Sequence, residues 1–182
     1  GYVLKKSNEG DFNIDAVVGE ETDDERVYIY DIFYDNESDT LYGLGTKYKI
    51  LNGFGEPEDL VLCSYNKDEN CFTLTSTFDV DYLFYTDTTE LNTFVVRNNK
   101  TYILYKKMAE INTVCLDIFD PNGGEPTKTI DISKSFDENL LRDKLSINDM
   151  TVIDEKIYIL WSYLKYDNNV AYNPNVPSKI ES

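Results

Sequence analysis

Histidine is absent from the 182 residues, and this absence alone excludes several classes of active site. Without an imidazole, the chain cannot build a Ser-His-Asp or Cys-His nucleophile system, a His-ligated zinc site or a haem site with a proximal histidine. Positive charge is also scarce, with 17 Lys and Arg residues against 34 Asp and Glu residues. The resulting net charge of −17 repels phosphate groups, so we expect no nucleic-acid partner.

Alanine, the best helix former, occurs only three times, whereas the chain has 15 Tyr and 9 Phe residues. Aromatic side chains fit the pleated surface of strands, so the composition predicts a mostly β fold. A hydrophobic content of 41% is enough for a packed core and argues against a disordered acidic tail. No apolar run approaches the roughly 18 residues that a membrane-spanning helix needs, and we expect no membrane insertion.

Cysteine occurs three times, as Cys63, Cys71 and Cys115, and the spacing argues against a zinc ribbon or a thioredoxin-type motif. Cys63 and Cys71 flank a turn-rich stretch, and as opposite residues of a hairpin they would be within reach of a disulfide. We favour the alternative of two free, partly buried thiols, because three cysteines are too few for a disulfide framework. The cysteines therefore do not decide the compartment.

An internal repeat is the most informative feature of the chain. Three segments combine an apolar strand, a short polar loop and a Tyr-centred strand, which predicts three hairpins. These segments are Ala16–Val18 with Arg26–Tyr30, Phe94–Val96 with Lys100–Tyr105, and Thr151–Ile153 with Lys156–Trp161. Tyr28, Tyr102 and Tyr158 take the same position in the three segments, and we expect all three to pack in the core.

A second pattern, of two strands around a turn rich in Pro, Gly and Asn, follows each hairpin. Such residues favour sharp reversals of the chain. The pattern comprises Thr40–Leu44, 52–57 and Leu60–Leu62 in the first unit, Thr113–Phe119, 120–126 and Lys128–Ile132 in the second, and a shortened Tyr172–Ile180 in the third. Each complete unit is therefore predicted to contain four strands.

The spacing of the repeated tyrosines sets the length of the units. Tyr102 and Tyr158 are 158 − 102 = 56 residues apart, whereas Tyr28 and Tyr102 are 102 − 28 = 74 apart. We assign the difference to an insertion with an added hairpin. The prediction is one domain, residues 1–182, with units at 13–65 (insertion 66–90), 91–135 and 146–182. Between the last two units, Ser135 and Glu138 have the spacing of a capping box, which predicts a short helix at 136–145.

Four-strand units whose inner strands are apolar on both faces resemble the blades of β-propellers. The resemblance covers about Asn13 to Ile180 and implies an all-β fold of about three four-stranded antiparallel blades. Since propellers have about four to eight blades, the three would be part of a larger ring. The resemblance is architectural, because the chain lacks the WD dipeptide, the kelch arrangement of a glycine pair followed by spaced Tyr and Trp, and the Ser-x-Asp-x-Gly-x-x-Trp box of sialidases. A β-sandwich is the alternative fold.

Acidic residues gather in clusters such as 20–25, 35–39, 79–81 and 120–125, and their oxygen atoms suit calcium. None of these clusters has the spacing of an EF-hand loop. Asp and Asn favour turns in any case, because they bond their own backbone, so solvated turns explain the clusters better. We expect no metal and no other cofactor, and calcium is the alternative.

Paired carboxylates or a Tyr nucleophile serve some glycoside hydrolases, but no pair stands out among 34 acidic residues. The prediction is therefore no enzyme and no catalytic residue. We predict a non-catalytic binding or scaffold module, extracytoplasmic or at the cell surface, that contacts a protein or a glycan through loops and strand ends. A carboxylate- or Tyr-dependent glycoside hydrolase and a purely structural repeat segment of a larger protein are the alternatives.

Aromatic residues in the loops are the candidates for contact with a partner, since they offer a large surface with a polar tip. The candidates are Phe54, Tyr65, Tyr166 and Tyr172. Trp161 lies inside an apolar strand and is expected to pack.

Overall fold

The computed structural model describes residues 2–6, 12–18, 25–52, 54–82, 89–109, 111–136, 145–164 and 180–181. Nearly all of these residues lie in strands or in the turns between them. The described part contains a single 3-10 helix, η1 (Ser133–Ser135), and no α-helix. The predicted all-β class is confirmed.

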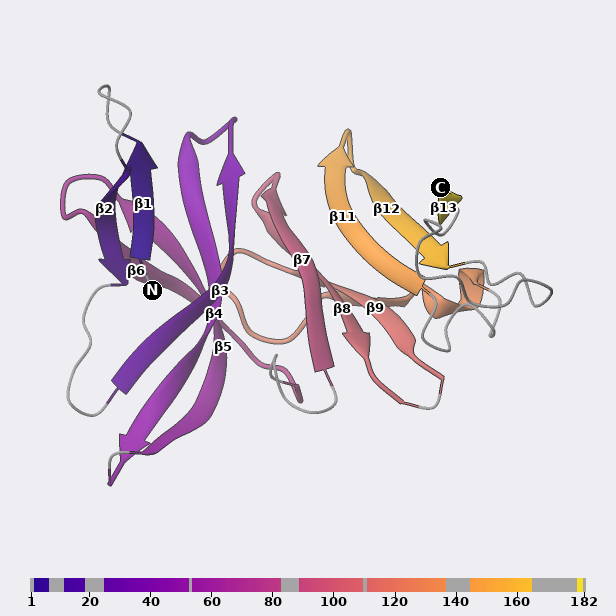
Figure 1. Cartoon of the computed structure of the whole chain (residues 1–182), viewed down its shortest axis with the longest axis horizontal. Coiled ribbons are helices and arrows are strands. Elements are labelled where there is room, and N and C mark those ends of the chain that lie inside the picture. The colour runs from indigo at the N-terminus through magenta and orange to yellow at the C-terminus, as the bar shows by residue number, and fades with distance from the viewer. Residues whose placement is uncertain are drawn as a thin grey trace, which may run out of the picture.

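The strands form three sheets (Figure 1). The first sheet is an antiparallel meander of β3 (Glu25–Asp35), β4 (Thr40–Leu51), β5 (Phe54–Asn66) and β6 (Cys71–Phe78). A hairpin of β1 (Tyr2–Lys6) and β2 (Phe12–Val18) extends it beyond β6 through a short parallel pairing. The second sheet is a meander of β7 (Thr89–Arg97), β8 (Lys100–Lys107), β9 (Thr113–Phe119) and β10 (Lys128–Asp131). The third contains β11 (Leu145–Ile153), β12 (Lys156–Leu164) and the two-residue β13 (Ile180–Glu181).

The sheets stand side by side, from the first at the left of Figure 1 to the third at the right. One apolar cluster, which includes Leu44 and Leu62 of the first sheet and Phe94 and Phe119 of the second, fills the space between these two sheets. Another cluster, with Leu116 of the second sheet among its members, joins the second sheet to the third. The second sheet is thus covered on both faces, which explains why β8 and β9 are apolar on both faces.

A β-bulge occurs at the same position in β3, β7 and β11, the strands that begin the three successive hairpins. The pairing register skips one residue in each case, Tyr30 in β3, Asn92 in β7 and Asn148 in β11. Each skipped residue lies five positions before the end of its strand (35 − 30, 97 − 92 and 153 − 148). The repeated bulge aligns the three hairpins residue by residue.

This alignment corrects the expected repeat, because Tyr42 takes the position of Tyr102 and Tyr158 in place of Tyr28. Each of the three lies two residues after the start of its second strand (42 − 40, 102 − 100 and 158 − 156). The intervals between them are 102 − 42 = 60 and 158 − 102 = 56 residues, so the alignment needs no long insertion at 66–90. Residues 71–78 are the fourth strand of the first sheet and pair with β5, not with an added hairpin.

The predicted hairpins have mixed outcomes. Those of β7 with β8 and of β11 with β12 are confirmed. The expected hairpin of β2 with β3 is wrong, because β2 pairs with β1 and β6 while β3 pairs with β4. The predicted helix falls mainly on 137–144, outside the described residues, although its first residue Phe136 is extended and its last, Leu145, begins β11. The shortened pattern at 172–180 also lies outside them, apart from Ile180.

The repeated tyrosines differ in burial. Tyr102 packs in the core as predicted, but Tyr28 and Tyr158 are about half exposed, so the prediction is wrong for these two. Tyr28 makes an edge contact with the ring of Tyr48 instead, at 5.1 Å between centroids. Trp161 packs as predicted, against Phe136 among others.

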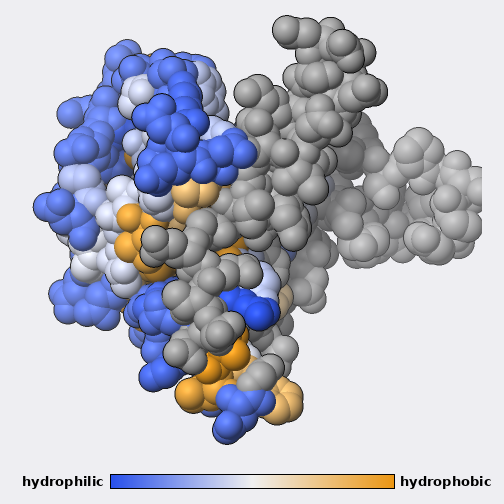
Figure 2. Space-filling model, turned by 90° about the vertical axis from the view of Figure 1, so that its left-hand side faces the viewer, coloured by the Kyte–Doolittle hydropathy of each residue, from blue (hydrophilic) through white to orange (hydrophobic). Residues whose placement is uncertain are grey.

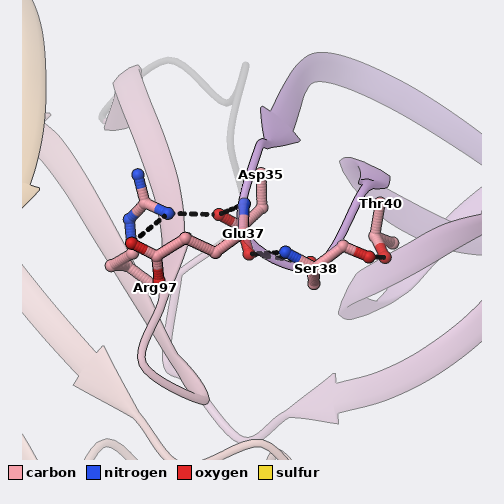
Figure 3. Close-up of polar contacts among 5 residues, drawn as sticks. All are labelled: Asp35, Glu37, Ser38, Thr40 and Arg97. Carbon is pink, nitrogen blue, oxygen red and sulfur yellow. Dashed lines mark hydrogen bonds and ion pairs between the residues drawn. The ribbon is translucent and has the colours of Figure 1, made fainter.

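An ion pair between Asp35 and Arg97 connects the ends of β3 and β7 (Figure 3). Asp35 is only 6% exposed, and its carboxylate lies 2.5 Å from Nη1 of Arg97. Ser38 donates its hydroxyl and its backbone N–H to the same carboxylate, and Glu37 lies 3.2 Å from Arg97. Burial alone would raise the pKa of Asp35, but these hydrogen bonds and the guanidinium charge together hold it below its usual value.

Candidate functional site

A cleft of about 410 Å³ lies where the chain leaves β6 and meets the second sheet. Side chains from β8, β9 and β10 form its floor, and the chain after β6 and the turn before β10 form its rim. Among the residues that the structure describes, ten line it: Asp79, Val80, Asp81, Tyr82, Tyr105, Lys107, Asp117, Glu125, Pro126 and Thr129. Four of them are acidic and one is a lysine, so the lining is polar and mostly negative.

Asp117 is the centre of this cleft, and it is only 2% exposed. Tyr82 donates its hydroxyl to one carboxylate oxygen at 2.6 Å, and Thr129 donates to the other at 2.5 Å. Strand register explains the second contact, because Thr129 lies directly opposite Asp117 in the pairing of β10 with β9. Both oxygens of the buried carboxylate therefore have a donor.

Two tyrosines stack above this carboxylate. The rings of Tyr82 and Tyr105 are 4.3 Å apart between centroids at an angle of 27°. Burial, followed by the hydrogen bond and the negative charge of Asp117, raises the pKa of Tyr82 far above its usual value. Burial and the charge of Asp117 also raise the pKa of Tyr105. Both hydroxyls therefore stay protonated at neutral pH and are poor nucleophiles.

Lys107 brings the cationic group into the cleft. Its Nζ lies 5.6 Å from the centroid of the Tyr82 ring and 5.9 Å from that of Tyr105, within the range of cation–π contacts. The same atom is 3.8 Å from Asp81, and both side chains are open to solvent. The cleft thus combines one cationic hydrogen-bond donor, Lys107, with carboxylate acceptors and with the neutral hydroxyls of two tyrosines.

A second cavity of about 540 Å³ contains two of the cysteines. Cys63 lies opposite Leu74 in the sheet, and Cys71 lies opposite Asn66, so the two are not paired with each other. All three cysteines are free, which confirms the favoured prediction. Burial raises the pKa of Cys63 to about 11, so this thiol is inert at neutral pH.

The aromatic residues predicted to contact a partner are scattered. Phe54 is well exposed, and Tyr65 packs on Phe72 at 5.7 Å between ring centroids. Tyr166 and Tyr172 lie outside the described residues. Neither Phe54 nor Tyr65 lines the cleft.

The acidic clusters contribute to the cleft in part. Asp79, Asp81 and Glu125 line it, whereas Asp35 belongs to the ion pair with Arg97, and 20–24 lie outside the described residues. Within the described ranges, no group of three Cys, Asp or Glu residues is placed to hold a metal ion. A raised pKa is found for the carboxyl of Asp31, mainly because of burial, and this residue lines neither cavity.

Sequence reasoning missed the central residues Tyr82, Lys107 and Asp117. One signal was present, since Asp117 is a charged residue within the apolar strand Thr113–Phe119 and a buried charge needs partners. No family model, curated protein or solved structure matches the chain. None of the described residues belongs to a helix with the length and hydrophobicity needed to cross a membrane.

Proposed function

We propose that the chain is a non-catalytic binding module that takes a neutral glycan in the cleft around Asp117. One observation carries the proposal: the ionisable groups at the centre of the cleft already form hydrogen bonds or an ion pair with one another. The carboxylate of Asp117 accepts from Tyr82 and Thr129, and Lys107 lies beside Asp81. Such a site is arranged to hold a ligand and has no free nucleophile of the Tyr or carboxylate type at its centre.

The chemistry of the lining supports a glycan as the ligand. Carboxylates at the rim accept hydrogen bonds from sugar hydroxyls, and Lys107 donates to ring or hydroxyl oxygens. An anionic ligand would meet four acidic residues here and a net charge of −17 on the whole chain. The loops and strand ends that carry Asp79, Asp81 and Glu125 are the kind of surface expected for the contact.

A propeller-like architecture is part of the proposal. It is supported by the meander order of the first two sheets, by the contacts of β7 with both β3 and β11, and by the bulge that recurs in these three strands. A β-sandwich has two layers, whereas the second sheet here has a neighbouring sheet on each face. The acidic, Tyr-rich composition supports an extracytoplasmic or surface location.

The test is saturation-transfer NMR on the chain with uncharged cello-, xylo-, manno- and chito-oligosaccharides. We expect signals for at least one series, loss of these signals in Lys107→Met, and their retention in the matched control Lys106→Met. Lys106 neighbours Lys107 on the same strand but pairs with Glu90, at 2.8 Å, and does not line the cleft. Absence of binding at millimolar concentrations, equal binding by both variants, or release of shorter sugars would overturn the proposal.

A further inference from the structure

The third sheet exposes residues whose counterparts in the other two sheets form interfaces. Tyr102 and Leu104 of β8 are 6% and 0% exposed, because they face the third sheet. In the first sheet the counterpart Leu44 is fully buried towards the second sheet. The counterparts in the third sheet, Tyr158 and Leu160, are 51% and 56% exposed. Each sheet therefore presents the same pair of positions in the same direction, and only the last pair is open to solvent.

The first sheet shows the complementary situation on its outer face. Phe94 and Val96 of β7 are buried against the first sheet, and Met150 of β11 is buried in the same way against the second. Their counterparts on β3, Ile32 and Tyr34, are about half exposed. Figure 2 views this side of the molecule and shows hydrophobic atoms among mostly hydrophilic ones.

The two exposed faces correspond to the two sides of an interface between neighbouring sheets. The Tyr158–Leu160 face corresponds to one side and the Ile32–Tyr34 face to the other. The hairpin of β1 and β2 pairs with the first sheet at β6, and β2 also contacts β3, yet Ile32 and Tyr34 are still about half exposed. The hydroxyl of Tyr34 already donates to Asp39, so covering its ring would leave no unsatisfied polar group. The outer face along β3 therefore has the chemistry of an interface between sheets.

We propose that the Tyr158–Leu160 face of one copy of this chain packs on the Ile32–Tyr34 face of a second copy. The contact would repeat the one by which the Tyr102–Leu104 face of the second sheet meets the third. A contact between two different faces either closes into a ring or continues as an open filament. If the sheets are arranged as in the proposed propeller, two copies of this chain supply 2 × 3 = 6 sheets, which is within the usual range of about four to eight blades. Three copies would exceed this range.

Charge opposes this association and provides a diagnostic. Each copy has a net charge of −17, so two copies repel each other at low ionic strength. Added salt screens this repulsion, and it also strengthens the burial of apolar side chains when the salt is a sulfate. The dimer is therefore favoured at high salt, in contrast to complexes held by ion pairs.

Sedimentation of the 182-residue chain tests the proposal. We expect a dimer of twice 21.0 kDa that is populated more at about 1 M than at about 0.1 M salt. Leu160→Glu should weaken it by about tenfold or more, because a charge would replace a leucine that the proposed contact buries. The matched control is Leu51→Glu, which introduces the same charge at a similarly exposed leucine at the far end of β4 and should leave the dimer unchanged. Circular dichroism checks that each variant folds.

Ile32→Glu separates the proposed contact from a symmetric one. It should weaken the dimer by a similar factor, and a mixture of the Ile32→Glu and Leu160→Glu variants should associate more tightly than either variant alone, through the one intact interface. A monomer at every salt concentration, a dimer that either substitution leaves as tight as the wild type, or an equal loss in Leu51→Glu would overturn the proposal. Oligosaccharide binding by the Leu160→Glu variant reports on the cleft separately, so either proposal can fail without the other.

Discussion

Replacement of Arg97 by Met removes the cation that lies beside the buried carboxylate of Asp35. Breaking a buried pair by removing one partner costs about 3–5 kcal/mol. Two features of this site reduce the cost: the Arg97 side chain is one-fifth exposed, and Ser38 still donates its hydroxyl and backbone N–H to Asp35. Met also keeps most of the aliphatic stem of Arg. We therefore expect a loss of about 2–3 kcal/mol in the free energy of unfolding.

Thermal and urea unfolding at neutral pH measure this loss. For a chain of this size, about 1 kcal/mol shifts the melting temperature by about 2–4 °C, so Arg97→Met should lower it by about 5–10 °C. A double-mutant cycle with Asp35→Asn isolates the coupling of the two side chains. Lys67→Met is the control, because it breaks the ion pair with Asp39, in which both side chains are largely exposed, and should leave the melting temperature within error.

The pH dependence gives the sign of the effect independently. The pKa of Asp35 is lowered in the folded protein, so its ionised form stabilises the fold fully above the unfolded-state pKa of about 3.9. This contribution is lost as the pH falls through the lower, folded-state pKa. The difference between wild type and Arg97→Met should therefore shrink below about pH 4. Additive losses in the cycle, or an Arg97→Met effect no larger than that of Lys67→Met, would refute the reasoning.

Three further outcomes are expected. Gly45→Ala should destabilise the fold by at least about 2 kcal/mol in urea unfolding, because its Cβ would lie 2.2 Å from a backbone oxygen. Gly55→Ala should be mild, because the nearest atom to its Cβ is a ring carbon of Tyr48 at 3.3 Å. Tyr82→Phe should cost about 1–3 kcal/mol in the same assay, since Asp117 loses a buried donor; wild-type stability would contradict the network. Cys63 should resist a thiol reagent at pH 8, where about one thiolate per thousand exists at a pKa of about 11; rapid labelling would contradict its burial.

The two hairpins that the sequence predicted correctly have turns with a local signal. Asn98 and Asn99 both have positive φ, as do Asp154 and Glu155, which is the geometry of the tight turns that match strand twist. The missed hairpin joins β3 to β4 through the longer turn 36–39. Its polar residues resemble those of the sequence 19–24 before β3, so the pattern did not reveal whether β3 pairs with the strand before it or the strand after it.

The bulge and the cleft were beyond sequence reasoning for physical reasons. The skipped residue is Tyr30 in one sheet and Asn in the other two, so its type gives no common signature. The contact of Tyr82 with Asp117 joins residues 35 positions apart, one in the chain after β6 and the other in β9. Local periodicity predicts which residues are buried, but not which buried residues of two sheets meet.

The second sheet packs against a neighbouring sheet on both faces, and this determines the order in which the sheets unfold. Removing either neighbour exposes one full apolar face of this sheet, so its amides should open only when the whole stack unfolds. The first and third sheets each have one neighbour to lose, and repeat arrays of this kind fray from their ends inwards. Stability is therefore graded along the chain, with slowest hydrogen exchange in β8 and β9, and a partner at either end would protect the terminal sheets most.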